Sequence, residues 1–276
     1  MAASLLSLFR PNLTSRKMTV KPLAVLKKSR KTRIPYELKR GQNRLFHQLP
    51  SGLNMEVIEQ KGIETHAGDI ADFIQKKLKL PPVLLGHSFG GLIIQYFIAN
   101  IRNKQLIEMK KLCPYPDLAG AVLVCCVPPS GNSGLVWRYL FSKPIAALKV
   151  TRSLAAKAFQ TDLSLCKETF FTSTMEDHLV MRYQELMRES SRMPLFDLRK
   201  LNASLPVPSV PKSSMEVLVV GASDDFIVDA EGLDETGRFY GVSPICVEGV
   251  AHDMMLDCSW EKGAKVILSW LNALSR

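Results

Sequence analysis

The stretch VLLGHSFGGLIIQYFIAN, residues 83–100, decides the fold of this chain. Its first three residues form a short apolar run without alternation, which predicts a strand buried on both faces. Residues 91–100 are apolar on nearly every side, which predicts a helix buried behind a sheet. Gly86 and Gly90 flank Ser88 two positions away on either side. A strand that turns so tightly into a helix needs glycines there, and the turn lifts the Ser88 hydroxyl above the sheet.

Further strands and helices are predicted on both sides of this stretch. Residues 44–60 alternate like a two-stranded hairpin, and residues 65–78 place apolar side chains at spacings of three and four, as an amphipathic helix does. Downstream, three apolar runs predict buried strands and one amphipathic run predicts a C-terminal helix: 119–126, 217–220, 245–247 and 260–274. Strands that alternate with helices indicate an α/β fold with a mostly parallel sheet flanked by helices.

A helical, loop-rich segment interrupts this alternation at residues 128–211. An insertion over the carboxyl ends of parallel strands is placed to act as a cap. We therefore expect one domain over residues 41–276, cap included, because a chain of 276 residues that is 46% hydrophobic can bury one sizeable core. Charged or polar residues interrupt every apolar run before it reaches the length of a membrane helix, so no integral membrane segment is predicted.

The formal net charge of +10 lies in the first 40 residues, whose only acid is Glu37. The remainder of the chain is neutral, which argues against nucleic-acid binding. Residues 1–36 contain no acid and mix Ser, Thr and Ala with Lys and Arg, a composition typical of an organelle transit peptide. We interpret them as a disordered transit peptide for the chloroplast, with the mitochondrion as the alternative. A disordered basic tail that stays attached fits the same composition.

Ser88 is a candidate nucleophile that needs two partners. A serine hydroxyl attacks only when an imidazole takes its proton and an acid orients that imidazole. Asp225 and His252 each follow a predicted strand, where open α/β sheets place functional loops. The chain order Ser, Asp, His also matches this motif. Asp224 competes for the role of the acid, and we favour Asp225 because the apolar residues 226–228 would anchor it facing inward.

Other residues give weaker signals. His87, beside Ser88, either shapes the pocket or has a structural role. The six cysteines show no paired metal-ligand spacing, and we interpret them as reduced thiols, mostly in the core. No glycine-rich phosphate loop with its lysine is present either. The sequence therefore predicts neither a metal site nor a cofactor.

From about Arg44 to the C-terminus, the chain resembles the plant α/β-hydrolase superfamily. Residues 65–74, followed by the motif at residues 86–91, are similar to its chloroplast-targeted lipase-like or esterase-like members. The resemblance implies the α/β-hydrolase fold with a helical cap and a triad of Ser88, Asp225 and His252. It also implies that the N–H of Phe89 is one donor of the oxyanion hole.

One segment of the family pattern is missing near Gly62. Members have two more strands and a helix between the first hairpin and the helix before the elbow, and a loop after the first of these strands supplies the second oxyanion donor. Here only residues 61–64 fill that interval, whereas the missing elements need roughly 35 to 50 residues. The chain thus resembles a shortened form with an incomplete sheet and no second donor. The strand at residues 83–85 should gain an unpaired edge.

Three functions fit these observations. The first is a serine hydrolase of the esterase or lipase type acting on a small ester or acyl compound, impaired by the lost donor. The aromatic content of the cap, including Phe159, Phe170 and Phe171, suggests an apolar substrate group, although these residues could equally pack helices. The second is an inactive module that binds a ligand or a protein, and the third is lyase-like use of the same triad.

Overall fold

The described part of the chain comprises residues 7–9, 62–101, 115–142, 144–190, 195–209 and 215–274 of a computed structural model. All of it belongs to one unit, Met1–Pro11 with Gln60–Arg276. A second unit, Asn12–Glu59, lies outside the described residues. The hairpin expected at residues 44–60 and most of the expected transit peptide therefore stay predictions.

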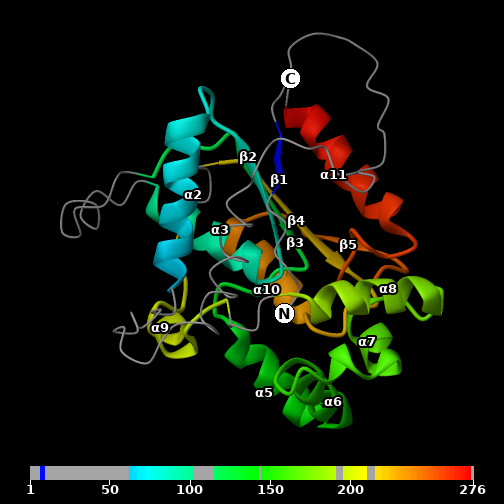
Figure 1. Ribbon diagram of the computed structural model, residues 1–276. Coiled ribbons are helices and arrows are strands. Elements are labelled where there is room, and N and C mark those ends of the chain that lie inside the picture. The colour runs from blue at the N-terminus through cyan, green and yellow to red at the C-terminus, as the bar shows by residue number, and fades with distance from the viewer. Residues whose placement is uncertain are drawn as a thin grey trace, which may run out of the picture. The chain divides into compact units, whose positions relative to one another are not determined.

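Four parallel strands form the body of the sheet, as the sequence predicts (Figure 1). In order across the sheet they are β2 (Val83–His87), β3 (Gly120–Val124), β4 (Val217–Ala222) and β5 (Ile245–Val247). Leu84 lies opposite Ala121, and Val220 lies opposite Ile245. Because the strands are parallel, their carboxyl ends share one edge of the sheet, and the loops that follow them meet there.

The expected unpaired edge of β2 is in fact covered by another strand. Strand β1 (Ser7–Phe9) lies antiparallel to β2, with Leu8 opposite Leu84. The sequence predicts an unpaired apolar edge at residues 83–85, but an open edge offers backbone donors and acceptors to any extended segment within reach. A segment from the start of the chain occupies it here.

Helices cover both faces of the sheet. Helices α2 (Ile63–Lys77), α3 (Phe89–Asn100) and α10 (Ala230–Tyr240) pack on one face, and α11 (Trp260–Leu274) packs on the other (Figure 1). Side chains alternate between the two faces along each strand: Leu84 lies in the cluster with α2 and α3, whereas Val83 lies in the cluster with α11. Both faces of β2, β3 and β4 are buried, which explains why their sequences lack a polar alternation.

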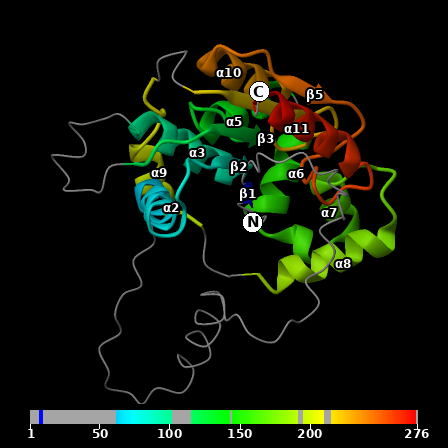
Figure 2. The same cartoon turned by 90° about the horizontal axis from the view of Figure 1, so that it is seen from above.

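Helices fill the interval between β3 and β4. They are α5 (Asn132–Ser142), α6 (Pro144–Leu154), the 3₁₀ turn η1 (Ala158–Gln160), α7 (Leu163–Phe170), α8 (Asp177–Arg188) and α9 (Leu198–Ala203). In Figure 2, α6, α7 and α8 lie together, whereas α9 lies beside α2. Leu201 of α9 accordingly belongs to the core formed with α2 and α3.

The helices α7 and α8 have a small core of their own. Phe159, Phe170 and Phe171 are at most 3% exposed and pack with Met175 and Val180. These three phenylalanines therefore pack helices against each other, which is the second of the two roles expected for them. Within the described residues, no helix combines the length and the apolar character needed to cross a membrane.

Candidate active site

Ser88 stands at a sharp turn between β2 and α3. Its backbone has φ 53° and ψ −123°, a left-handed conformation that costs a non-glycine residue about 1 to 3 kcal/mol. The surrounding main chain supports it: the Ser88 N–H donates to the Val124 oxygen at 3.1 Å, and the Gly91 N–H donates to the Ser88 oxygen at 3.0 Å. The turn therefore has the strained form that presents a serine above a sheet.

Neighbouring glycines make this turn sterically possible. A Cβ on Gly86 would lie 2.6 Å from Ile94 Cδ1 and 2.7 Å from the carbonyl of Gly90. A Cβ on Gly91 would collide with the Cβ of Cys126. At Gly86, strand and helix approach each other so closely that no larger residue fits, which explains the first glycine of the motif.

Asp225 and His252 form a buried pair. His252 Nδ1 lies 3.0 Å from each carboxylate oxygen of Asp225, and the two side chains are 1% and 2% exposed respectively. Asp225 Oδ1 also accepts the main-chain N–H groups of Ile227 at 2.8 Å and Val228 at 2.9 Å. A carboxylate fixed in this way holds the imidazole in one orientation with Nδ1 protonated, leaving Nε2 to accept a proton.

Asp224, the competing acid, points elsewhere. It is exposed, and its carboxylate accepts the Ser223 hydroxyl at 2.8 Å. The two neighbouring aspartates thus have different environments: the amides of residues 227 and 228 turn Asp225 inward, and Asp224 stays at the surface.

The elbow and the histidine loop meet at the carboxyl edge of the sheet. The rings of His87 and His252 lie 4.8 Å apart between centroids, so the residue next to Ser88 contacts the candidate base. The half-buried Ser88 hydroxyl itself makes no hydrogen bond to any described residue. Asp225 and His252 are therefore brought together, whereas a contact between Ser88 and His252 stays a prediction.

His87 is buried and neutral. Burial, together with the nearby His252, lowers the pKa of His87 to about 3. Its Nε2 lies 2.9 Å from the main-chain oxygen of His252, and a carbonyl oxygen can only accept, so Nε2 carries the proton. His87 therefore ties the end of β2 to the loop that carries His252, a structural role that the sequence left open.

The pKa of His252 is raised, in contrast to that of His87. Burial alone would lower the pKa of His252, but the charge and hydrogen bond of Asp225, with a smaller effect of Asp253, raise it above its ordinary value. The imidazolium form is thus stabilised by its acid partner, as a base that must hold a transferred proton requires.

Asp253 is an unexpected member of this region. It is 2% exposed, its Oδ1 lies 3.6 Å from His87 Nε2, and that oxygen has no hydrogen-bond partner. Burial and repulsion by Asp225, against the attraction of His252, raise the pKa of Asp253 to about 6. The sequence shows only an acid next to a histidine, and nothing in it signals that this acid is buried.

Cys125 is the second residue that the sequence reading did not single out. It follows β3 with φ 43°, is 1% exposed and lies beside Asp225. Two sets of potential metal ligands occur here, Cys125 with Asp225 and His252, and His87 with His252 and Asp253. Both sets include His252, whose Nδ1 is already bonded to Asp225.

Phe89 begins α3, and its N–H is therefore one of the helix's first amides, which have no intrahelical acceptor. It is placed beside Ser88, as one oxyanion donor should be. The absence of the second donor was predicted from the short interval at residues 61–64, and it stays a prediction because the expected hairpin before this interval lies outside the described residues.

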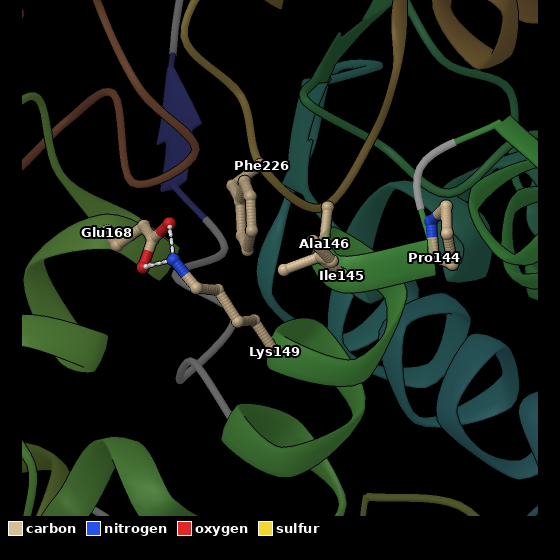
Figure 3. Close-up of a pocket in the computed structure, with 6 residues that line it drawn as sticks. All are labelled: Pro144, Ile145, Ala146, Lys149, Glu168 and Phe226. Atoms are coloured by element: carbon tan, nitrogen blue, oxygen red, sulfur yellow. Dashed lines mark hydrogen bonds and ion pairs between the residues drawn. The ribbon is translucent and has the colours of Figure 1, made fainter.

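Two cavities are lined in part by the loop that follows β4. One of about 350 Å³ lies between α6, α7 and Phe226, and Figure 3 shows Phe226 and Ile145 facing the same space, with the Lys149–Glu168 ion pair at its side. A smaller cavity of about 70 Å³ is lined by Asp225 itself, with Cys125 and Cys246 among its neighbours. The larger cavity has an almost entirely apolar wall apart from the ion pair.

Known proteins resemble this arrangement. The family model described as "Alpha/beta hydrolase family" matches residues 59–265, whereas no curated protein matches the chain. Among solved structures, an esterase from Exiguobacterium antarcticum is 19% identical over 76% of this chain and 74% of that chain, with a TM-score of 0.52. A putative lipase from Acinetobacter baumannii is 17% identical over 82% and 73%, with a TM-score of 0.49. At 19% identity the likeness to the Exiguobacterium esterase shows the fold alone, and it is the fold described above.

Proposed function

Because the chain belongs to the alpha/beta hydrolase family, we propose that it is a serine hydrolase that cleaves small esters through Ser88, Asp225 and His252. The observation that carries the proposal is the buried Asp225–His252 pair beside the strained turn at Ser88. A histidine with this orientation and a raised pKa suits a general base, and a strained serine at the start of a helix suits a nucleophile.

The proposed reaction has two halves. The Ser88 hydroxyl attacks the ester carbonyl carbon while His252 Nε2 takes its proton, and the N–H of Phe89 stabilises the oxyanion. The alcohol leaves with the proton from His252, and an acyl group remains on Ser88. Water then attacks this acyl-enzyme while His252 takes its proton, and His252 returns that proton to the Ser88 oxygen as the carboxylic acid is released. Asp225 remains ionised and stabilises the imidazolium in both halves.

A fluorophosphonate probe tests the nucleophile directly. We expect one labelled serine in the full chain and no label in Ser88→Ala, because the probe reacts only with an activated serine. Ser223→Ala is the matched control and should keep the label, since Ser223 lies near Asp225 but its hydroxyl bonds Asp224 and the Gly249 amide. An unlabelled protein that is well folded by circular dichroism contradicts the proposal.

A non-catalytic binding function is the second candidate, and the four-residue interval at residues 61–64 favours it. With a single oxyanion donor the rate should be about 10²- to 10³-fold lower than with two. If the chain acts only by binding, Ser88→Ala leaves its biological effect unchanged. A lyase-like reaction is separated from both by identifying the product, since only hydrolysis incorporates oxygen from labelled water into the acid.

We also propose that residues 1–36 direct the chain to the chloroplast, with the mitochondrion as the alternative. Support comes from their basic, acid-free composition. A fluorescent protein fused after residue 36 should enter the organelle, and a fusion that remains in the cytosol contradicts this.

A further inference from the structure

Three buried side chains around the candidate base bring metal-binding atoms together: His87, His252 and Asp253. One ligand atom of each, a ring nitrogen or a carboxylate oxygen, lies within 4.8 Å of the other two. All three side chains are at most 2% exposed. Two imidazoles and one carboxylate form a ligand set that binds Zn²⁺ in many proteins, with water in the fourth position.

The distances within this group suit a single ion. Asp253 Oδ1 lies 3.6 Å from His87 Nε2. Two ligands that are each about 2.1 Å from a tetrahedral Zn²⁺ lie roughly 3.4 Å apart, so these two atoms already have nearly the separation that zinc requires. On binding, the His87 ring carries its proton on Nδ1, and Nε2 exchanges its hydrogen bond with the His252 oxygen for the ion.

The Asp253 carboxylate is the observation that points to a cation. Its Oδ1 is buried without a hydrogen-bond partner, which is rare for an oxygen of an acid. Among the described residues, no lysine or arginine forms an ion pair with Asp253 or with Asp225, the other carboxylate beside His252. Buried carboxylates are normally paired with a cation or bind a metal. A divalent ion here would satisfy the unpaired oxygen and offset the negative charge.

The two imidazoles are suited to hold such an ion. Because burial lowers the pKa of His87 to about 3, its ring is neutral, which is the form that binds a metal. His252 is bonded to Asp225 through Nδ1, which leaves Nε2 for the ion. Histidines that bind metals are commonly oriented by a carboxylate on the other ring nitrogen. The sequence predicts no metal site because its cysteines lack a ligand spacing, but this set contains no cysteine.

We propose that His87, His252 and Asp253 bind Zn²⁺ and that the bound ion inhibits ester hydrolysis. An ion on His252 Nε2 occupies the lone pair that must take the proton of Ser88, so the base cannot act while zinc is bound. The inhibition rests on the proposed function, whereas the binding rests on the three side chains alone.

Equilibrium dialysis against Zn²⁺ tests the binding, using the full chain after metal has been removed with EDTA. We expect one ion per chain and a melting temperature that rises with zinc, because an ion that binds only the folded state stabilises it. Asp253→Asn should bind zinc at least about 10- to 100-fold more weakly, since even the loss of a residue that orients a ligand costs this much. This variant keeps the shape of the side chain and removes a buried charge, so it should fold.

A second variant and a control accompany this measurement. His87→Gln removes another ligand and should weaken zinc binding by at least the same factor. His178→Ala is the matched control, because His178 forms an exposed pair with Glu176 at 3.0 Å, and it should bind zinc like the full chain. Equal binding by Asp253→Asn, no binding by the full chain, or loss of binding in His178→Ala or Cys125→Ser instead would overturn the proposed site.

Ester hydrolysis with and without zinc tests the inhibition, each variant being compared with its own metal-free rate. Zinc should inhibit the full chain, and half-inhibition of Asp253→Asn should need at least about 10- to 100-fold more zinc. A chain that binds zinc but has no esterase activity contradicts the proposed function and leaves the metal site standing. An active chain that binds zinc at this site and is not inhibited contradicts the inhibition alone.

Discussion

Two opposing effects act on the pKa of His252: burial lowers it, because it disfavours the charged form, and Asp225 raises it. The acid dominates, so the pKa of His252 lies above its ordinary value of 6.5. A general base must be neutral to accept a proton, and we therefore expect kcat/KM for ester hydrolysis to rise with pH through an inflection above 6.5. A profile measured from pH 5 to 9 checks this, and an inflection below 6.5 would contradict it.

The two neighbouring aspartates offer a matched pair of variants. Asp225→Asn keeps the shape of the side chain but no longer fixes the histidine tautomer, so kcat should fall about 10⁴-fold, by analogy with the triad acid of serine proteases. Asp224→Asn alters an exposed side chain that does not contact His252 and should change kcat less than about twofold. Equal losses in steady-state ester hydrolysis for both variants would show that Asp225 is not the orienting acid.

Asp253 should make the protein less stable at neutral pH. Its folded pKa is about 6 against an ordinary value of 3.8, so the folded state resists ionisation. Above pH 6 both the folded and the unfolded states are ionised and the full cost is present, whereas below about pH 4 both are protonated and the cost disappears. Asp253→Asn should therefore raise the free energy of unfolding at pH 8, by up to roughly 3 kcal/mol.

Urea unfolding of this variant at pH 8 and at pH 4 measures the difference. The stabilisation should shrink as the pH falls from about 6 to about 4. A variant that is less stable at pH 8 would show that Asp253 has a favourable partner when ionised.

At the scale of elements, Asp257 joins the segment after α7 to the histidine loop. It is 1% exposed and accepts the Thr172 N–H at 2.8 Å, the Thr172 hydroxyl at 3.1 Å and the Ser259 N–H at 3.1 Å. Thr172 lies just after α7, and Asp257 lies five residues after His252. The hydrogen bonds therefore fix the end of α7 to the segment that carries the candidate base.

Loss of the hydrogen bonds of Asp257 should lower the stability of the fold. Asp257→Ala leaves buried donors without acceptors, and we expect the free energy of unfolding to fall by about 1.5 to 3 kcal/mol. Asp177→Ala is the control, because Asp177 pairs with Lys167 at the surface and its removal should cost at most about 1 kcal/mol. Thermal and urea unfolding compare the two variants, and similar losses would mean that the buried connection contributes no more than a surface ion pair.

At the scale of the whole molecule, the start of the chain completes the sheet. Strand β1 covers the free edge of β2, and removal of residues 1–36, as a transit peptide requires, would take it away. A chain that starts at residue 37 should therefore be less stable than the full chain and should associate at high concentration, because the bare edge can pair with another copy.

Light scattering at increasing protein concentration compares the two chains. The full chain serves as the control, since its edge is covered. If the shortened chain is equally stable and remains monomeric, the β1 pairing contributes nothing to the fold.

The sequence by itself determined most of the framework. The C-terminal helix was expected at 260–274 and is found there, and the strands at β2 to β5 follow from apolar runs without alternation. The turn at Ser88 was also predictable, because tight backbone approach leaves a direct signature, glycine at fixed positions. These features are local: neighbouring residues and their period encode them.

Only the tertiary structure decided which groups meet. His87 and His252 are 165 residues apart in the chain, and no local pattern encodes their contact. The inward position of Asp225, the burial of Asp253 and the packing role of Phe170 all depend on how distant elements dock. Periodicity in the sequence predicts which face of an element is apolar. The burial of a residue and its pKa depend on which distant elements cover that face, and only the tertiary structure shows those contacts.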